Sequence, residues 1–528
     1  MSCGRIFMYE VYRDEQSSYT TKVKKRVVYF LLICAVVIVG FFLRIYPSLS
    51  TIAFPYDQTR DLLFIKQSIQ EKNLFILGPV TDITGVHHGP IFYYYLTFVY
   101  GISRYSPEFA VLFMSGVFAI MNIVVAIVFD RMHARRIGFL FTVLFSFSYE
   151  MYAYARWISN PVLVIPLWML FLIFSIRYFR LFSYKTLFVL GCLAGLMMQA
   201  QLLMGYMMLT GLYFVFRAPR KTRFFSIVVW IGGFFFGSLP IFLSEFLFRF
   251  QAMKGLIQFA TQNHSVVPLV TMLERVLSAL NISIQNSVFL QLQTKNIGVL
   301  FLILIGVLAY LTSKKEKHFR YAVELCLVSI VLFLPIFLTG KSPINFFFIA
   351  LNIPVFFLVA FAFSKIRHVM ILFFLCGFII TTQLWTIFEQ ASVPYVFIQQ
   401  NVTLSERDEI VSFIHSRNGN KPFSVSVFGT PFGVKTTWSY YFLRHATNYN
   451  SELPIWFGPY AKGYVGESIL LSSDHPAQIH VVIYEPSFSI DAILKDQFGV
   501  QQDEATMLVS RYEIRSHIIE FREPKQQP

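Results

Sequence analysis

Residues 54–61 read FPYDQTRD and stand a few residues past the first long apolar run of the chain, 27–47. This short stretch gathers two carboxylates and a guanidinium, those of Asp57, Asp61 and Arg60. A run of about 20 apolar residues is long enough to cross the hydrocarbon core of a bilayer. FPYDQTRD is therefore expected where the chain first leaves the membrane, and its charges are candidates for function.

The composition indicates a polytopic membrane protein. Of the 528 residues, 56% are hydrophobic and only 14% are charged, whereas soluble domains carry about 25% charged residues. The net charge of +15 sits mainly in short loops between apolar runs, which is the pattern that membrane topology produces. The basic residues therefore predict contact with membrane lipid and no nucleic-acid partner.

The apolar runs and the basic loops together predict the topology. The runs long enough to span a bilayer are 27–47, 108–129, 137–155, 161–179, 184–200, 202–216, 224–246, 296–312, 321–339, 346–363 and 369–388. Alternate loops are basic, with Arg131, Arg135 and Arg136; Arg177, Arg180 and Lys185; Arg217, Arg220, Lys221 and Arg223; Lys314, Lys315, Lys317 and Arg320; and Lys365 and Arg367. Because basic loops stay in the cytoplasm, the N-terminus is predicted inside and the C-terminus outside. The fold class is an all-α membrane protein of about eleven spans, followed by a small external α/β domain.

The predicted domains follow from this topology. A cytoplasmic tail, 1–26, precedes a membrane domain, 27–388, and an extracytoplasmic domain, 389–528. Within the membrane domain, 48–107 and 247–295 are the two large external loops. The last domain holds three strand-like runs and a helical stretch between the first two: FSVSVF (423–428), QIHVVIY (478–484), HIIEF (517–521) and 433–445.

The first external loop is predicted to contain two helices at the membrane surface. Leu62, Ile65 and Ile69 recur at helical spacing after the charge cluster, which is typical of a helix lying in the interface plane. On that helix Asp57 and Asp61 are four residues apart and share a face. The second helix begins after HHGP, where a proline suits the first helical position.

Asp57 and Asp61 each have two interpretations. Asp57 either caps the first surface helix or acts as a general base that takes a proton from an acceptor hydroxyl. Asp61 either orients that acceptor or pairs with Arg60.

Other polar residues near the external ends of the predicted spans are candidate substrate contacts. His87 and His88 are either interfacial polar residues or contacts to phosphate or metal. Gln199 and Gln201 are candidates for binding sugar hydroxyls. Glu245, near the outer end of its predicted span, is expected to point into the bundle or at water, because a carboxylate facing lipid is costly.

The motifs resemble those of a known family. YDQTRD (56–61), LGPVTDITGVHHGPIFYYYL (77–96) and YARWISNP (154–161) are together similar to motifs of bacterial GT-C glycosyltransferases. These are the relatives of protein O-mannosyltransferases, of glycosyltransferase family 39, and of the aminoarabinose transferase that modifies lipid A. The similarity covers about 27–250 in motif and the whole chain in layout.

The resemblance implies a GT-C fold and an inverting glycosyltransferase in the bacterial inner membrane, with its active site on the extracytoplasmic side. The donor would be a polyprenyl-phosphate monosaccharide, and the acceptor a hydroxyl of a protein, a lipid or a cell-envelope glycan. Asp57 stands where the family has its base. Gln58 follows it where relatives have a second acid, and His88 and Gly89 stand before Pro90 where the lipid A enzymes carry an acid. No cofactor is implied, and a divalent metal is left open.

The chemistry of this reaction agrees with these residue types. Phosphate is a good leaving group, so one base and a few cations that stabilise developing charge suffice. Arg60 and Arg156 are the candidate donor phosphate-binding residues, because both lie on the external side against the positive-inside bias. The alternative for Arg156 is an interfacial anchor. The methionine-rich run 197–208 either lines a groove for a prenyl chain or packs against lipid.

Three other functions remain open from the sequence. A transporter or flippase of lipid-linked sugars would carry ionisable groups in mid-span and broken helices. The charges of this chain cluster at the external ends of the predicted spans instead, and Glu324 is the chief exception. A polysaccharide ligase would need arginines in late external loops, whereas 339–345 offers only Lys341. A scaffold would serve to display 389–528, and its function would be abolished by deleting that domain.

Overall fold

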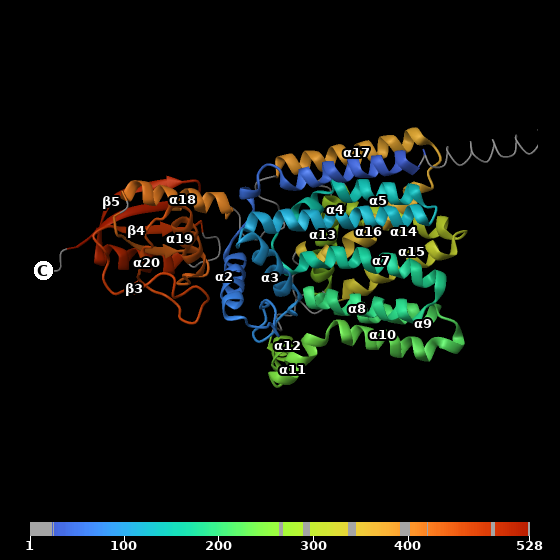
Figure 1. Ribbon diagram of the computed structural model, residues 1–528, viewed down its shortest axis with the longest axis horizontal. Coiled ribbons are helices and arrows are strands. Elements are labelled where there is room, and N and C mark those ends of the chain that lie inside the picture. Colours follow the sequence, from blue (N-terminus) through green and yellow to red (C-terminus); the bar gives the residue numbers. More distant parts are fainter. Residues whose placement is uncertain are drawn as a thin grey trace, which may run out of the picture.

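The computed structural model describes residues 24, 26–262, 268–288, 296–335, 345–390, 402–419, 421–486 and 492–525. Within these ranges a bundle of long helices carries an α/β domain at one end (Figure 1). Helices α2 (Tyr56–Glu71) and α3 (Ile91–Ser103) lie between the bundle and the domain. Lys341, the one cation of the predicted late external loop, is outside the described residues.

The described helices coincide with the apolar runs. The bundle contains Arg26–Ile45, α4 (Pro107–Arg131), α5 (Arg135–Phe147), α6 (Tyr149–Ala155), α7 (Val164–Leu181), α8 (Tyr184–Ala200), α9 (Met207–Arg217), α10 (Arg223–Gly237), α14 (Ile297–Ser313), α15 (Lys317–Phe333), α16 (Asn352–Ser364) and α17 (Val369–Glu389). Short 3₁₀ turns precede several of them: η1 (Leu49–Thr51), η2 (Asn160–Leu163), η3 (Leu202–Tyr206), η4 (Arg220–Thr222) and η6 (Asn345–Leu351). Among described residues five helices are long and apolar enough to cross a membrane, or six if one bent pair is a single span. The count of eleven spans therefore stays a prediction.

The bent pair corrects the prediction of one straight span over 224–246. Helix α10 ends at Gly237, and α11 (Leu239–Leu247) continues at an angle of 66°. Pro240 stands in the first turn of α11, where proline cannot donate a helical hydrogen bond to the preceding turn. The chain then enters α12 (Gln251–Gln262), so Glu245 lies beyond the bend.

The predicted external loop 247–295 also holds helix α13 (Leu269–Val288). The second half of α13 is buried, and it packs against the bundle. Ser283 and Ser287 donate hydrogen bonds to the buried carboxylate of Glu150, over 3.0 and 2.9 Å. Part of this segment is therefore built into the bundle.

Glycines bring α8 and α10 into close contact, which positions the outer end of α8. A Cβ added at Gly191 would lie 2.6 Å from the Trp230 carbonyl oxygen, and one at Gly195 would lie 2.7 Å from the Ser238 nitrogen. Gly233 and Gly237 face α8 in the same way. Small residues four apart are the usual means by which membrane helices approach so closely.

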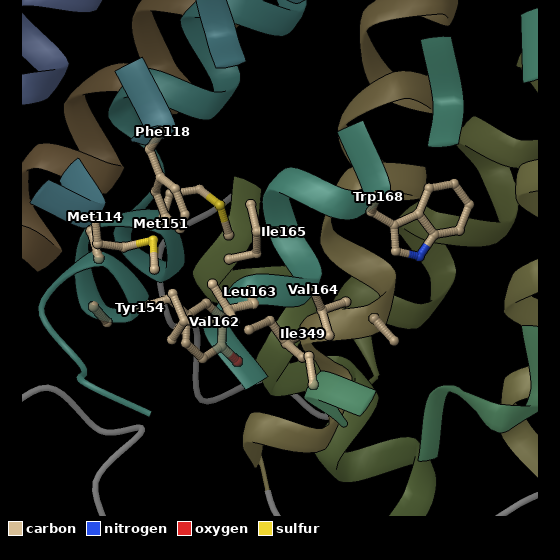
Figure 2. Close-up of a cluster of buried hydrophobic side chains, with 14 of the residues drawn as sticks. Met114, Phe118, Met151, Tyr154, Val162, Leu163, Val164, Ile165, Trp168 and Ile349 are labelled. Atoms are coloured by element: carbon tan, nitrogen blue, oxygen red, sulfur yellow. The ribbon is translucent and has the colours of Figure 1, made fainter. Parts of the chain in front are cut away.

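The bundle interior is filled by side chains from distant segments. Met114 and Phe118 of α4, Met151 and Tyr154 of α6, and Trp168 of α7 are among the labelled members of the core (Figure 2). Their close packing holds α6 and the start of α7 in place, so the segment between them is anchored at the outer end of the bundle.

The predicted cytoplasmic loops meet at one end of the bundle. Asp130 accepts from Arg26 and Arg135. Glu324 accepts from Arg217, Arg320 and Tyr213, and Lys365 pairs with Glu316. The α/β domain is at the opposite end (Figure 1), as the predicted topology requires.

The C-terminal domain is a six-stranded sheet with strand order β3-β2-β1-β4-β6-β5. Its elements are α18 (Leu404–Asn418), β1 (Ser424–Phe428), α19 (Thr436–Tyr449), β2 (Ile455–Phe457), β3 (Ser472–Ser473), β4 (His480–Tyr484), α20 (Ala492–Ala505), β5 (Thr506–Ile514) and β6 (His517–Pro524). Strands β1 to β4 are parallel to one another, and β6 is antiparallel to both of its neighbours, β4 and β5. The strands and the helix expected from the sequence are confirmed.

This domain is docked on the first external loop. Phe54 donates its backbone N–H to the Val402 carbonyl over 3.0 Å, and the Tyr441 hydroxyl donates to the Phe54 carbonyl over 3.0 Å. Arg444 of α19 bridges to Glu108 at the start of α4. The domain therefore has a fixed position over α2 and α4.

Candidate active site at the start of α2

Helix α2 begins one residue before Asp57. Its N-cap is Pro55, which makes no side-chain capping bond, and Asp57 lies in the first turn. The interpretation of Asp57 as the N-cap is therefore wrong. An aspartate in the first turn is still favoured by the helix dipole, and its carboxylate is left available for other contacts.

Arg60 joins the two aspartates into one cluster. It donates to Asp57 over 2.8 Å and to Asp61 over 2.8 and 2.9 Å. The Tyr93 hydroxyl of α3 donates to the same Asp61 oxygen over 3.2 Å. The predicted pairing of Asp61 with Arg60 is confirmed, and Tyr93 is a partner that sequence reasoning missed.

The two carboxylates have opposite environments. The side chain of Asp57 is 67% exposed and that of Asp61 only 8%. Burial raises the pKa of Asp61 to about 6, although Arg60 opposes the shift. Burial also disfavours the charge of Arg60, but Asp61 and Asp57 together raise its pKa. Asp57 therefore presents an accessible carboxylate that is bound by Arg60, and the buried Asp61 fixes the position of Arg60.

The two histidines have different positions. His87 lies in an isolated bridge with Val80, and its Nδ1 is 3.3 Å from the Gly78 carbonyl oxygen. His88 is half-buried, its ring Nδ1 is enclosed without a hydrogen-bond partner among the described residues, and burial lowers its pKa to about 4. A neutral His88 is poorly suited to bind phosphate as a cation, while His87 stays at the margin of a cavity described below.

The predicted glutamines connect segments of the bundle. The side-chain amide of Gln199 donates to the Gly237 carbonyl over 2.6 Å, and the backbone carbonyl of Gln199 accepts from the Gly89 N–H over 2.9 Å. A Cβ on Gly89 would lie 2.5 Å from Gln199 Cβ, so glycine is needed for this approach. Gln201 is buried. These contacts favour a positioning role for Gln199.

Among the described residues Arg156 makes no hydrogen bond or ion pair with Asp57, Arg60 or Asp61. It is 1% exposed and donates to the carbonyls of Arg44 and Ser48, over 3.1 and 2.9 Å, and to the Thr51 hydroxyl over 2.7 Å. Its guanidinium also lies over the Tyr152 ring. These contacts fix the turn that leads from the first helix into the external loop.

Glu245 is half-buried and caps α12. Its carboxylate accepts from the backbone N–H groups of Ala252 and Met253, over 3.3 and 3.1 Å. This contact holds α12 against α11 after the bend.

A cavity of about 400 Å³ opens beside α11 and α12. Its polar lining consists of His87, Ser244, Glu245 and Gln251. The rest is mainly apolar: Leu77, Gly85, Val86, Met198, Leu202, Ile241, Phe242, Phe246, Phe248, Phe250, Ala252, Met253 and Leu256. In the sequence only the methionine-rich run 197–208 indicated this cavity. The opposite wall is formed by α11 and α12, and it depends on the bend at Ser238, which the apolar pattern does not predict.

The described residues contain no group of three or more His, Cys, Asp or Glu side chains arranged to hold a metal ion. The carboxylates and histidines of the first external loop are thus not gathered into one ligand set.

Several known proteins are similar to this chain. Residues 87–244 match the family model described as dolichyl-phosphate-mannose-protein mannosyltransferase. ArnT from Cupriavidus metallidurans, in a crystal structure bound to undecaprenyl phosphate, is 10% identical with a TM-score of 0.57, over 93% of this chain and 97% of that chain. The Archaeoglobus fulgidus oligosaccharyltransferase, in a complex with Zn and sulfate, is 11% identical with a TM-score of 0.40, over 76% of this chain and 60% of that chain. No curated protein matches the chain by sequence.

The likeness to ArnT extends over nearly the whole of both chains, so the GT-C fold expected from the motifs is confirmed. The chain is an integral membrane protein of this fold. The family model covers Arg156 and Gln199 but not Asp57, Arg60 or Asp61.

Proposed function

We propose that this GT-C-fold protein is an inverting glycosyltransferase that moves a sugar from a polyprenyl-phosphate monosaccharide to a hydroxyl acceptor on the outer face of the bacterial inner membrane. The observation that carries the proposal is the exposed carboxylate of Asp57, which Arg60 holds at the first turn of α2. The crystal structure of ArnT bound to undecaprenyl phosphate supports the class of donor.

The proposed reaction needs few groups. Asp57 takes the proton of the acceptor hydroxyl, whose oxygen attacks the anomeric carbon of the donor sugar. The bond from that carbon to the phosphate oxygen breaks, and the polyprenyl phosphate leaves with the electron pair. Arg60 stabilises the charge on the leaving phosphate, and Asp61 and Tyr93 keep its guanidinium in place.

The cavity beside α11 and α12 is the proposed site of the prenyl chain. Its volume of about 400 Å³ is in the range of small-molecule sites, which are mostly apolar with few polar groups. His87 in its lining remains a proposed contact to the donor phosphate, and Glu245 a proposed contact to the substrate. The contacts of Arg156 and Gln199 favour positioning of the backbone over direct binding. His88 and Gln201 are enclosed by the protein, which favours a structural role for them as well.

The transporter alternative is favoured by the bend between α10 and α11 but not by its candidate ionisable group, Glu324. Glu324 lies at the end of the bundle where the basic loops meet, and it is paired with Arg217 and Arg320. A carboxylate saturated in this way is a poor candidate for a proton or ion relay.

The test compares a deletion strain with the same strain complemented by the wild-type gene, by Asp57→Asn or by Glu71→Gln. Mass spectrometry of lipids and surface glycans is the measurement. We expect one sugar mass to be lost without the gene and restored by wild type and by Glu71→Gln, an exposed carboxylate on the same helix. Asp57→Asn should reach the membrane in normal amount and give a product reduced by about 10²–10⁴-fold.

Restoration of the product by Asp57→Asn would refute the proposed base. The absence of any changed sugar mass in the deletion strain would refute the transferase itself.

The cavity is tested with undecaprenyl phosphate as the probe, by native mass spectrometry of the purified protein. Leu202→Trp fills the cavity and is expected to reduce binding at least tenfold. Leu209→Trp places the same ring on an exposed, lipid-facing position and should leave binding unchanged. Equal binding by both variants would exclude the cavity as the prenyl site.

A further inference from the structure

The segment 239–262 leaves the bundle at the bend that ends α10. Helix α11 diverges from α10 by 66°, and α12 follows after a turn in which Arg249 and Phe250 have positive φ. Figure 1 shows both helices at the rim of the bundle, at the end that carries α2 and α3. Nine bulky apolar side chains between Leu239 and Ile257 are 41–69% exposed. Apolar side chains gathered in this way mark an interaction surface.

The exposed side of α11 continues the lipid-facing side of α10. Phe235 and Phe236, in the last turn of α10, are exposed. Leu239, Leu243 and Leu247 of α11 are exposed as well, and residues four apart share one face of a helix. These three leucines are outside the lining of the cavity. They therefore extend the membrane-facing surface of the bundle around the bend.

Helix α12 turns one face to the protein and the opposite face outward. A Cβ added at Gly255 would lie 2.5 Å from the Thr84 carbonyl oxygen, and one added at Gly85 would lie 3.0 Å from Gln251 Cγ. Gln251 and Gly255 are four residues apart, so the face that they share is packed on the first external loop. Ile257 is about 200° further round the helix than Gly255, and it is exposed. The outward face of α12 is therefore apolar.

Two cations stand beside these apolar faces. Arg249 and Lys254 are exposed, and neither forms an ion pair within the part of the chain that the structure describes. Glu245 is the one acid of 239–262, and its carboxylate already accepts from two backbone N–H groups of α12. Neither cation is in the lining of the cavity. The segment thus presents positive charge that complements an anionic surface.

We propose that the 239–262 segment is a docking surface for anionic phospholipid, which lies in the bilayer leaflet on the side of the C-terminal domain. Ile257 and the three leucines of α11 face the acyl chains, and Arg249 and Lys254 bind lipid phosphate groups. Helices that lie in the membrane interface combine an apolar face with lysine and arginine in this way. The proposal does not depend on the transferase function.

A second copy of the chain fits this surface less well. In a two-fold contact the same patch meets itself. Arg249 and Lys254 of both copies would then approach one another, and Glu245 is already engaged by α12. Because like charges repel, such a contact is disfavoured, whereas anionic phospholipid neutralises both cations.

The first test measures whether the outward face of α12 meets water. The full-length Ile257→Met variant is placed in nanodiscs that hold one copy, and hydroxyl radicals oxidise accessible methionines to the sulfoxide. Ile257 and the native Met507 of β5 are 57% and 58% exposed, so Met507 is the internal reference. We expect the introduced methionine to oxidise at least tenfold more slowly than Met507, because lipid covers it. One copy per disc excludes cover by a second copy.

The second test measures the contribution of the two cations. The probe is phosphatidylglycerol that carries a photoactivatable diazirine, and mass spectrometry quantifies its crosslinks to α12. Arg249→Gln/Lys254→Gln should lower these crosslinks at least tenfold, while crosslinks to the basic loops at the other end of the bundle stay within twofold. Lys421→Gln/Lys462→Gln removes two exposed lysines of the C-terminal domain and should change neither set. A phosphatidylcholine probe should crosslink to α12 equally in all variants.

Three results would overturn the proposal. These are equal oxidation of the two methionines, unchanged phosphatidylglycerol crosslinks in Arg249→Gln/Lys254→Gln, or a loss of undecaprenyl phosphate binding by that variant of more than twofold. The last result would assign the two cations to a donor site and not to the bilayer. If the double variant does not accumulate, the two single replacements are measured and the threshold for each is threefold.

Discussion

Replacement of Asp61 by asparagine should change how the stability of this protein depends on pH. The pKa of Asp61 is raised from 3.8 to about 6, chiefly by burial. A carboxyl whose folded pKa is raised contributes stability that is present below the unfolded pKa and is lost as the pH rises through the folded value. In wild type that contribution is therefore lost between about pH 4 and pH 6.

The size of the effect follows from the shift. Two pKa units at about 1.4 kcal/mol each give a loss of about 3 kcal/mol between pH 4 and pH 7.5. Asparagine does not titrate, so Asp61→Asn lacks this loss. Its own packing and its contact with Arg60 contribute equally at both pH values and cancel in the difference.

The assay is thermal unfolding of the purified protein at pH 4 and pH 7.5. We expect Asp61→Asn to gain stability relative to wild type on going from pH 4 to pH 7.5, by an amount on the order of 3 kcal/mol. Glu71→Gln, an exposed acid-to-amide change on the same helix, should follow the wild-type profile. If Asp61→Asn keeps the same pH dependence as wild type, Asp61 is not the buried titrating group described above and the reasoning fails.

The other predictions concern neighbouring elements. Arg60→Ala should raise the KM for the donor at least tenfold, as measured by steady-state kinetics. It should also destabilise the protein more at pH 7.5 than at pH 5, because it leaves Asp61 buried and ionised. Equal destabilisation at the two pH values in thermal unfolding would contradict the ion-pair argument. Gly195→Ala should cost about 1–3 kcal/mol because its Cβ meets α10, while Gly232→Ala, where the added Cβ meets nothing within 4 Å, should not lower the unfolding midpoint. Glu245→Ala should remove about 1 kcal/mol of capping from α12, seen as faster amide hydrogen exchange there, and unchanged exchange would show that the cap contributes nothing.

The docking of the C-terminal domain changes how its deletion would be interpreted. The backbone of Phe54 pairs with Val402, and Thr59 and Leu63 are covered by the domain. Deletion would therefore expose α2 and disturb a transferase site as well as remove a scaffold. A substitution such as Asp57→Asn, which leaves the domain in place, separates the two functions.

Local pattern was sufficient for much of this protein. Hydrophobic runs predicted the described helices and charge predicted that the basic loops lie at one end of the bundle, because both depend on residues that are close in the sequence. Strand-like runs predicted the sheet of the C-terminal domain for the same reason. The charge cluster at Asp57, Arg60 and Asp61 was found from spacing alone, since residues three and four apart on a helix are neighbours.

Tertiary structure decided the rest. The sequence does not distinguish exposed Asp57 from buried Asp61, because the difference depends on Tyr93, which is 32 residues away from Asp61. It does not reveal that Arg156 binds carbonyls more than 100 residues earlier, or that Gly466 of the C-terminal domain lies against Leu63 of α2. Side-chain burial and long-range hydrogen bonds are properties of how elements pack, and packing of distant segments leaves no periodic trace in the chain. The sequence by itself therefore determined the membrane fold and the candidate base, and the packing of the elements decided which neighbouring groups can act with it.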